Sequence, residues 1–296
     1  MSKSIVDVLP VGFRKYLSII NIDGVEEIRL RADKNAILYF GGNEGELVTD
    51  YIVSLDDIKE TLSYISMFSL YAYEDDIKEG FITIKGGHRV GLAGKIVREN
   101  GRIKTIGNIS SINIRVSHEV KGCSRCVLPS ITEDNKIFNT LIISPPGAGK
   151  TTLLRDVVRE LSDTYKRKVS LVDERSEIAA CYMGVPQNDV GIRTDVYDDC
   201  KKTEGLMLMI RAMSPQVVAV DEIGGLDDIN SLIDASRCGC NIVATIHGDS
   251  IEDVMGKSFM SILDKDRLFS RFIVLSNDSA RRISVYDENG AVLTER

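Results

Sequence analysis

One short segment combines residue types that suit the binding of a phosphate chain. Residues 144–152 read Ser-Pro-Pro-Gly-Ala-Gly-Lys-Thr-Thr and lie between an aliphatic run and a stretch with leucine and valine at helical spacing. A bound triphosphate requires inward-facing backbone N–H groups, a helix N-terminus, a lysine, and a hydroxyl group that contacts Mg²⁺. The segment supplies all of these and predicts a site for ATP and Mg²⁺. The residues expected at the nucleotide are Pro146, Gly147, Ala148, Gly149, Lys150, Thr151 and Thr152.

The segment departs from the usual pattern G-x-x-x-x-G-K-[ST] at its first position, where Ser144 replaces glycine. A residue with a Cβ must therefore form the turn at the start of the loop. The second half of the pattern, residues 147–151, is complete. We expect the departure to affect nucleotide affinity rather than binding as such. The alternative interpretation is a glycine-rich turn without a ligand.

Two acidic residues close a later aliphatic run. Residues 217–220 read Val-Val-Ala-Val and precede Asp221 and Glu222. In doubly wound sheets, ligands bind at the carboxyl ends of the strands, which would bring both carboxylates to the phosphate loop. This assigns Asp221, with Thr151, to Mg²⁺, and Glu222 to polarising the attacking water. A solvated strand end is the alternative.

Two more aliphatic runs end in polar residues. Residues 169–172 precede Asp173 and Glu174, and residues 242–246 precede His247. Both runs would deliver side chains to the same edge of the sheet. A neutral imidazole beside a γ-phosphate can report hydrolysis through a hydrogen bond, so His247 is a candidate site residue, although a lone histidine more often serves at the surface or in the core.

Composition excludes several classes of protein. The chain has 296 residues, of which 43% are hydrophobic and 27% charged, as in ordinary globular proteins, and its length favours two domains. A net charge of −7 argues against a basic protein that coats duplex DNA. No run approaches the roughly 18 apolar residues of a membrane helix, and Asp7 and Pro10 interrupt the N-terminal run. We therefore expect a cytoplasmic protein without a span or a secretory signal.

The six cysteines allow more than one interpretation. Cys123 and Cys126 have C-x-x-C spacing, whereas Cys238 and Cys240 are two residues apart. A zinc site built from both pairs is an alternative, but C-x-C fits the spacing of zinc ligands poorly. Reduced, ordinary thiols are the preferred interpretation for a cytosolic protein.

The hydrophobic pattern divides the chain into two parts. Residues 1–125 mix short strands with a helix near 55–67, which begins at a capping box of Ser54 and Asp57, and so predict a small α+β domain. From residue 138 to 296 strands alternate with helices, which predicts an α/β domain with a parallel-rich sheet. Residues 126–137 would form a linker.

Individual strands are expected from short β-branched runs and from the turn residues between them. A turn is expected at Gly107 and Asn108, and the last thirty residues would form an edge strand at 271–275 followed by a hairpin. The expected strands are 27–31, 36–40, 81–84, 89–97, 102–106, 112–116, 141–143, 169–172, 217–220, 242–246, 271–275, 283–286 and 291–293.

The combination of motifs resembles the secretion ATPase superfamily, which includes the hexameric motors of type II and type IV secretion and of type IV pili. The likeness rests on the phosphate loop, D-E-R-S-E-I-A at 173–179, I-R-A-M-S-P at 210–215 and A-T-I-H-G at 244–248. More narrowly, the sequence resembles the stage III AA sporulation family of endospore-forming bacteria. This likeness rests on the box at 173–179 together with G-G-H-R-V-G-L-A-G at 86–94 and I-N-I-R at 112–115. The likeness runs from about residue 25 to 280.

The resemblance implies a RecA-like P-loop NTPase domain, preceded by the smaller N-terminal domain, in a ring that is expected to be a hexamer. ATP would bind between the two domains, where Arg115 and Arg211 approach the γ-phosphate and Glu174 positions nucleotide or water. Arg89 is a further candidate, for which a surface salt bridge is an equal alternative. The expected catalytic set is Glu222, Glu174, His247, Arg115 and Arg211.

The resemblance also implies a motor that serves a membrane channel complex in endospore formation, peripheral at the membrane through a partner. Two other functions stay open. A RecA-like core also drives nucleic-acid motors or loaders, but scattered Lys and Arg, 6% aromatic residues and no tryptophan disfavour a strip for single strands. A nucleotide-gated scaffold would bind ATP to assemble the ring without significant turnover.

Overall fold

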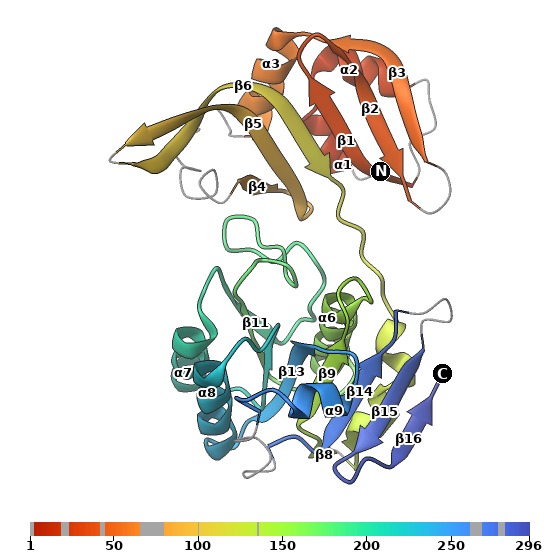
Figure 1. Cartoon of the computed structure of the whole chain (residues 1–296), viewed down its shortest axis with the longest axis vertical. Helices are drawn as coiled ribbons and strands as arrows, with labels where there is room; N and C mark the ends of the chain where they lie inside the picture. The colour runs from red at the N-terminus through yellow and green to blue at the C-terminus, as the bar shows by residue number, and fades with distance from the viewer. Residues whose placement is uncertain are drawn as a thin grey trace. The chain divides into compact units, whose positions relative to one another are not determined.

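The computed structural model consists of two compact units (Figure 1). The N-terminal unit comprises Met1–His118 and the segment Ala180–Gln187, and the C-terminal unit comprises Glu119–Ala179 and Asn188–Arg296. The structure describes residues 3–18, 24–41, 45–65, 80–99, 101–134, 136–260, 268–277 and 282–296.

The division between the units falls earlier than the domain limits 1–125, 126–137 and 138–296 that the pattern predicts. The reason is that residues 119–125 and the expected linker both belong to the C-terminal unit. Residues 119–125 include most of the 3₁₀ helix η2 (Cys123–Cys126), and the expected linker holds the short helix α5 (Leu128–Ile131). Within η2, Ser124 donates hydrogen bonds from its backbone N (2.8 Å) and its Oγ (2.7 Å) to the buried carboxylate of Asp156.

The N-terminal unit is an antiparallel sheet of six strands in the order β3-β2-β1-β6-β5-β4, with helices packed against it. Buried residues alternate along the strands, as a sheet with one face on a core requires, and the core includes Phe13, Ile28, Leu38 and Ile58. This confirms the predicted α+β fold. The elements are α1 (Lys3–Asp7), α2 (Val11–Leu17), β1 (Val25–Arg31), β2 (Lys34–Phe40), β3 (Glu46–Val53), α3 (Leu55–Ile65), β4 (Phe81–Ile84), β5 (His88–Glu99) and β6 (Arg102–Arg115).

Helix α3 begins at the predicted capping box. Asp57 N donates to Ser54 Oγ at 3.0 Å, and Ser54 N donates to Asp57 Oδ2 at 2.7 Å, so each side chain satisfies a backbone donor of the other residue. The helix ends at Ile65. The last two residues of the predicted helix, 66 and 67, lie outside the described residues.

Strand β6 runs unbroken through the segment where we expected a turn. The prediction of a turn at Gly107 and Asn108 is wrong, because β5 and β6 pair on both sides of that point. The register shifts across Gly94, and Asn108 has a φ of 45°. The glycine and asparagine that predict a turn therefore lie at a β-bulge within the paired strands.

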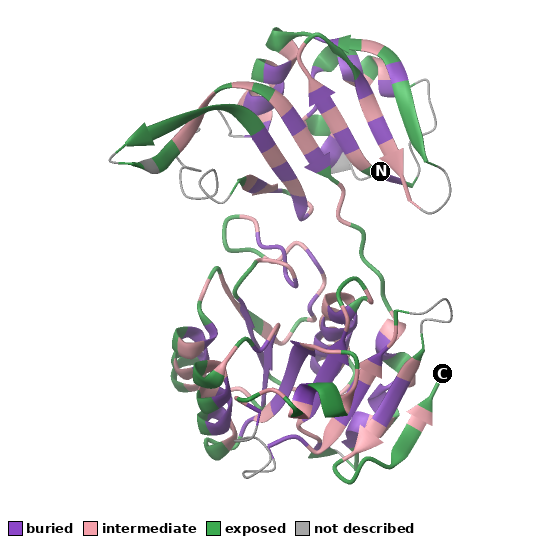
Figure 2. Ribbon diagram, viewed as in Figure 1, coloured by how far each residue is buried: buried purple, intermediate pink, exposed green. Residues whose placement is uncertain are grey.

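The C-terminal unit is built on an eight-stranded sheet in the order β11-β10-β12-β13-β9-β14-β15-β16. Neighbours from β11 to β14 are parallel, and the last two pairs are antiparallel. The predicted central strands are confirmed and are buried along their length (Figure 2). The strands are β9 (Thr140–Ser144), β10 (Val169–Asp173), β11 (Thr194–Asp198), β12 (Val217–Val220), β13 (Asn241–His247), β14 (Arg271–Leu275), β15 (Ile283–Asp287) and β16 (Val292–Glu295), with a small separate pair β7 (Thr132–Glu133) and β8 (Lys136–Ile137).

Helices cover both faces of this sheet. Alternate strand residues such as Leu141 and Val218 share one core cluster with Leu206 and Ile229, which come from two neighbouring helices, α7 and α8. The intervening strand residues, such as Ile142, point to the opposite face, where α6 supplies its apolar side. The helices are α6 (Lys150–Asp163), α7 (Lys202–Met213), α8 (Leu226–Arg237) and α9 (Ile251–Met255).

The C-terminal strands differ from the prediction in one respect. We expected residues 271–275 to form an edge strand, but β14 pairs on one side with β9 and on the other with β15. The edge is formed by β16, the second strand of the predicted hairpin. The edge-strand prediction is therefore wrong, because the hairpin extends the sheet beyond β14.

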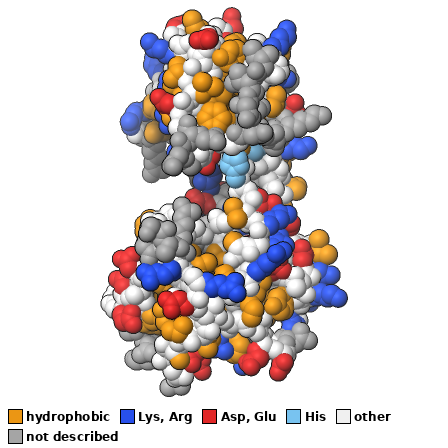
Figure 3. All heavy atoms as spheres, turned by 90° about the vertical axis from the view of Figure 1, so that its right-hand side faces the viewer, with side chains coloured by type: hydrophobic (Ala, Val, Ile, Leu, Met, Phe, Trp, Pro, Cys, Tyr) orange, Lys and Arg blue, Asp and Glu red, His pale blue; other side chains and the backbone are white. Residues whose placement is uncertain are grey.

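The surface of the molecule is chemically mixed. Acidic, basic and hydrophobic side chains are interspersed on the face that Figure 3 draws. Exposed aliphatic side chains include Ile52, Met183 and Ile192, and isolated residues of this kind are normal on protein surfaces. Within the described ranges, no helix is both long enough and apolar enough to cross a membrane.

Gly94 and Gly107 offer a matched test of the close approach of β5 and β6. A Cβ on Gly94 would lie 2.7 Å from the carbonyl oxygens of Gly107 and Asn108, whereas the nearest neighbour of a Cβ on Gly107 would be Val97 Cγ2 at 3.4 Å. We expect Gly94→Ala to lower the free energy of unfolding by about 1–3 kcal/mol and Gly107→Ala to change it by less than about 1 kcal/mol. Equal stabilities of the two variants in urea titrations would contradict this packing.

Candidate functional site

The phosphate loop connects the buried strand β9 to helix α6. Gly147 has a φ of 78°, and Gly149, the residue that caps α6, has a φ of 94°. A Cβ at either position would meet no atom within 4 Å. The loop therefore needs glycine for its left-handed backbone and not for space. Lys150 begins the helix, so the N–H groups of its first turn are available to an anion.

Ser144, the departure from the phosphate-loop pattern, sits in β9 without strain. It is fully buried and pairs in register with His247 of β13. Its carbonyl oxygen accepts a hydrogen bond from Gly248 N at 3.2 Å, and its Oγ donates to the carbonyl oxygen of Pro145 at 2.7 Å. The Cβ at this position is accommodated because the positive-φ residues of the loop come later, at the two glycines.

A buried cluster joins the loop to the acidic strand end. Lys150 Nζ lies 3.0 Å from Asp221 Oδ1 and 3.1 Å from Thr245 Oγ1, and Thr151 Oγ1 donates to Asp221 Oδ2 at 3.0 Å. Thr245 Oγ1 also donates to Asp221 and accepts from Glu222 N at 2.8 Å. Strands β9, β12 and β13 are neighbours in the sheet, and their carboxyl ends bring these residues together.

The cluster keeps Asp221 ionised. Burial by itself would raise the pKa of Asp221, but the charge of Lys150 and hydrogen bonds from Thr245, Lys150 and Thr151 outweigh it and hold the pKa below its ordinary value. A carboxylate and a hydroxyl oxygen are the hard donors that Mg²⁺ prefers, and Mg²⁺ is commonly held by one or two protein ligands together with substrate phosphates. Thr151 and Asp221 therefore fit the predicted metal.

Glu222 lies at the end of the same strand and has two charged or titratable neighbours. Its Oε2 is 2.8 Å from Arg175 Nη1, and its Oε1 is 3.7 Å from His247 Nε2. His247 Nδ1 lies 3.3 Å from the carbonyl oxygen of Ser144. The structure thus brings together two residues that the sequence marks as catalytic candidates, Glu222 and His247, and adds an arginine that it did not single out.

The two carboxylates at the start of the acidic box after β10, Asp173 and Glu174, have different partners. Asp173 is buried, and its carboxylate accepts hydrogen bonds from the backbone N of residues 177–179 at 2.8–2.9 Å. Burial raises the pKa of Asp173, against these three donors, which favour the charged form. Glu174 instead forms an ion pair with the buried Lys202. Both residues line the pocket, but the carboxylate of Asp173 holds the loop and that of Glu174 holds Lys202.

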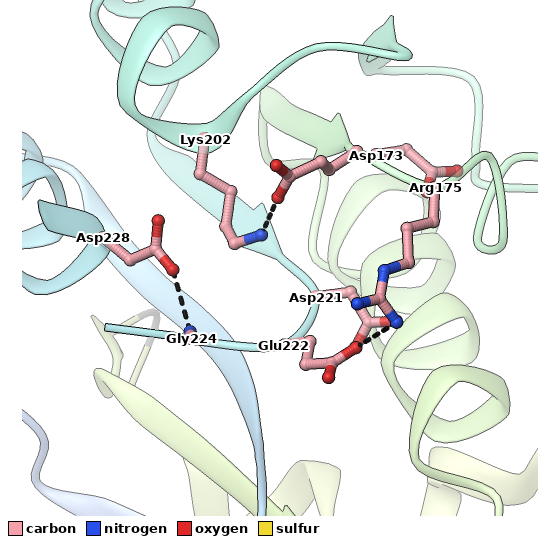
Figure 4. A pocket seen from close by; sticks show the side chains of 8 residues that line it. Asp173, Arg175, Lys202, Asp221, Glu222, Gly224 and Asp228 are labelled. Atoms are coloured by element: carbon pink, nitrogen blue, oxygen red, sulfur yellow. Dashed lines mark hydrogen bonds and ion pairs between the residues drawn. The ribbon is translucent and has the colours of Figure 1, made fainter. Parts of the chain in front are cut away.

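A pocket at this edge of the sheet is predominantly acidic (Figure 4). Arg175 and Glu222 point toward one another across it, and Asp228 accepts a hydrogen bond from Gly224 N at 2.8 Å. The pocket is lined by Asp173, Glu174, Arg175, Lys202, Asp221, Glu222, Gly224 and Asp228. Five carboxylates against two cations favour a ligand that contains a cation, as the metal ion of a metal–nucleotide complex does.

The arginines predicted to act on the γ-phosphate lie in different places. Arg115 Nε is 3.7 Å from Glu27 Oε2 in the N-terminal unit, and in the same unit Arg89 stacks 4.7 Å from the ring centre of Phe81. Arg211 is exposed in the last turn of α7 and is not among the residues that line the pocket. A γ-phosphate role for any of the three stays a prediction.

The sequence does not single out three residues of the site, Arg175, Thr245 and Lys202. Arg175 and Thr245 stand inside the motifs at 173–179 and 244–248, and their polar character next to predicted strand ends is a usable signal. Lys202 carries no local signal, because its partner Glu174 is 28 residues away in the chain. The two residues meet only through the fold, because Glu174 follows β10 and Lys202 begins α7.

The cysteines make local contacts. Cys123 Sγ lies 3.7 Å from the carbonyl oxygen of Thr152, and Cys240 Sγ lies 3.4 Å from that of Pro215. In the part of the chain that the structure describes, no three His, Cys, Asp or Glu side chains are grouped so as to hold a metal ion. A Mg²⁺ held by one carboxylate and one hydroxyl does not require such a group.

Thr245 tests whether the cluster depends on its central hydroxyl group. Thr245→Val keeps the shape but removes one hydrogen-bond partner each from Lys150, Asp221 and the backbone N of Glu222, so we expect the free energy of unfolding to fall by about 1–3 kcal/mol. Thr245→Ser keeps the hydroxyl and should retain most of the stability. Urea titrations of both variants provide the measurement, and equal losses would show that the methyl group matters rather than the hydrogen bonds.

Comparison with solved structures supports the RecA-like architecture. The Legionella pneumophila ATPase DotB superposes with a TM-score of 0.63 at 16% identity, covering 94% of this chain and 81% of DotB. The pilus retraction motor PilT, solved with bound ADP, superposes with a TM-score of 0.58 at 13% identity, covering 93% of this chain and 78% of PilT. At these identities the likeness shows the fold alone, and it confirms the predicted RecA-like α/β fold.

Comparison with sequences identifies the family. The chain is 42% identical over 300 residues to "Stage III sporulation protein AA" of Bacillus subtilis (strain 168), which covers 98% of this chain and 96% of that protein. Residues 1–293 match the family model described as "Sporulation stage III, protein AA". The chain therefore belongs to the sporulation stage III protein AA family.

Proposed function

We propose that this protein is a Mg²⁺-dependent ATPase that works as the motor of a secretion-type channel complex in endospore formation. The observation that carries the proposal is the buried cluster of Lys150, Thr151 and Asp221, with Glu222 at the end of the same strand. A lysine, a hydroxyl and an ionised carboxylate meet at the N-terminus of α6, as the binding of a metal–triphosphate requires.

The proposed roles follow from the chemistry of each side chain. Bound Mg²⁺ would supply charge neutralisation between the β- and γ-phosphates, and Thr151 and Asp221 provide oxygen atoms to hold it. Lys150 would turn from Asp221 to the phosphates. Glu222 would polarise the attacking water by accepting a hydrogen bond from it.

The remaining candidate residues have supporting roles in this proposal. His247, 3.7 Å from Glu222, would report the state of the γ-phosphate. Glu174, paired with Lys202, would position nucleotide or water. Arg115 and Arg211 would stabilise charge on the γ-phosphate in the assembled ring.

Assembly and location are further parts of the proposal. We propose a homo-oligomer, a hexamer, that acts from the cytoplasmic face of a membrane by binding a subunit of the channel complex. The names of similar proteins support the motor and sporulation parts of the proposal: DotB is called an ATPase, PilT a pilus retraction motor, and the Bacillus subtilis relative a sporulation protein.

Lys150→Ala is expected to abolish nucleotide binding, because the loop loses its buried cation. Titration calorimetry with ATP and Mg²⁺ measures the effect, and a check of folding by circular dichroism is needed because Asp221 loses its ion pair. Lys168→Ala, at an exposed position, serves as the control and should bind normally. Full ATP affinity of a folded Lys150→Ala protein would refute the phosphate-loop assignment.

Glu222→Gln is expected to retain ATP binding and to lower steady-state turnover by about 10²–10⁴, the usual weight of a lost general base. Phosphate release provides the measurement, and Glu252→Gln in the exposed part of α9 is the matched control. Unchanged turnover would remove Glu222 from the mechanism. Absence of turnover in the unmodified protein, with and without its membrane partner, would favour a nucleotide-gated scaffold.

A further inference from the structure

The cation nearest to Glu222 belongs to the acidic box and not to the arginines expected from the sequence. Arg175 follows β10 by two residues, and its Nη1 lies 2.8 Å from Glu222 Oε2. The side chain of Arg175 is 66% exposed, and that of Glu222 is 30% exposed. The ion pair is therefore partly exposed to solvent, and both of its residues line the pocket (Figure 4).

The other cations near the pocket are themselves buried. Lys150, 8% exposed, is held by Asp221 and Thr245, and Lys202, 7% exposed, is held by Glu174. Among the described residues that line the pocket, Arg175 is thus the cation whose side chain is accessible to a ligand from solvent. Its long side chain can change partner without exposing a buried charge.

The backbone on either side of Arg175 is held in place. Asp173, two residues before it, accepts three backbone hydrogen bonds from residues 177–179. Arg155 of α6 donates to the carbonyl oxygens of Glu177 (2.6 Å) and Ile178 (2.5 Å). The base of the arginine is therefore tied to the same helix that begins at the phosphate loop, while its guanidinium group is exposed.

The energies favour an exchange of partners. An exposed ion pair contributes little to stability, because water screens it. A terminal phosphate offers more negative charge than one carboxylate and can accept two parallel N–H bonds from a guanidinium group. A triphosphate held by the loop would therefore compete well with Glu222 for Arg175.

We propose that Arg175 exchanges Glu222 for the terminal phosphate of the bound triphosphate, and that this exchange frees the Glu222 carboxylate for the attacking water. The inference rests on the proposed function, because it requires a nucleotide at the phosphate loop. With a diphosphate bound, Arg175 stays on Glu222. Arg175 thus makes the pocket distinguish ATP from ADP and links the release of the water-polarising carboxylate to the presence of a γ-phosphate.

The test compares affinities for Mg²⁺–ADP and for the Mg²⁺ complex of a non-hydrolysable ATP analogue, AMPPNP, in the full chain. Arg175→Ala should weaken AMPPNP binding by about 10-fold or more, the weight of a charge-assisted hydrogen bond, and leave ADP binding within about twofold. Arg175→Lys should restore part of the preference, because it keeps the charge but not the bidentate geometry. Arg237→Ala is the control, since Arg237 is 69% exposed and paired with Asp234.

A second comparison isolates the coupling to Glu222. Glu222→Gln releases Arg175 and should strengthen AMPPNP binding, and this gain should shrink when Arg175 is already alanine. The role of Arg175 would be overturned, while the proposed function stands, if Arg175→Ala left the ratio of the AMPPNP and ADP affinities unchanged. It would also be overturned if Glu222→Gln strengthened AMPPNP binding equally with and without Arg175. If the unmodified protein binds neither nucleotide, the proposed function itself is refuted.

Discussion

The structure of the site depends on one buried ion pair, Lys150 with Asp221. Removing two charges from water costs more than their attraction returns unless hydrogen bonds satisfy the remaining donors and acceptors. Here Thr151 and Thr245 supply those bonds, so each oxygen of the carboxylate has a donor. The ion pair is stable only because the ends of β12 and β13 and the start of α6 converge on it, and that convergence places a lysine, a hydroxyl and an ionised carboxylate side by side.

Parallel register is the reason that the convergence occurs. Ser144 pairs with His247, and Val220 pairs with Ala244, so β9, β12 and β13 end at one edge of the sheet. A shift of one residue in any of these strands would turn its side chains to the other face. The aliphatic cores of the strands, buried by helices on both faces, fix this register. The hydrophobic core and the chemistry of the site are therefore specified by the same residues.

The sequence was informative wherever the signal was local. The phosphate loop, the strand that ends in Asp221 and the capping box at Ser54 each occupy a few consecutive residues, and the structure has each element where it was predicted. It was uninformative where two distant segments had to meet. The order of the strands decides that β14 is internal, that Lys202 reaches Glu174, and that Arg175 reaches Glu222. A β-bulge and a turn share residue types, which is why the irregularity in β6 was misjudged.

The loop after β10 combines a fixed backbone with an exposed arginine side chain, Arg175. Asp173 and Arg155 hold the loop from residue 177 to 179 by backbone hydrogen bonds, so the loop moves with α6 and not independently of it. At Ala179 the chain leaves the C-terminal unit, and Asn188, where it returns, donates from its N (3.0 Å) and Nδ2 (2.7 Å) to the carbonyl oxygens of Ala179 and Ile178. The intervening residues 180–187 belong by their contacts to the N-terminal unit. The hydrogen bonds from Arg155 and Asn188 therefore hold the backbone at the point where the chain leaves the C-terminal unit and returns to it.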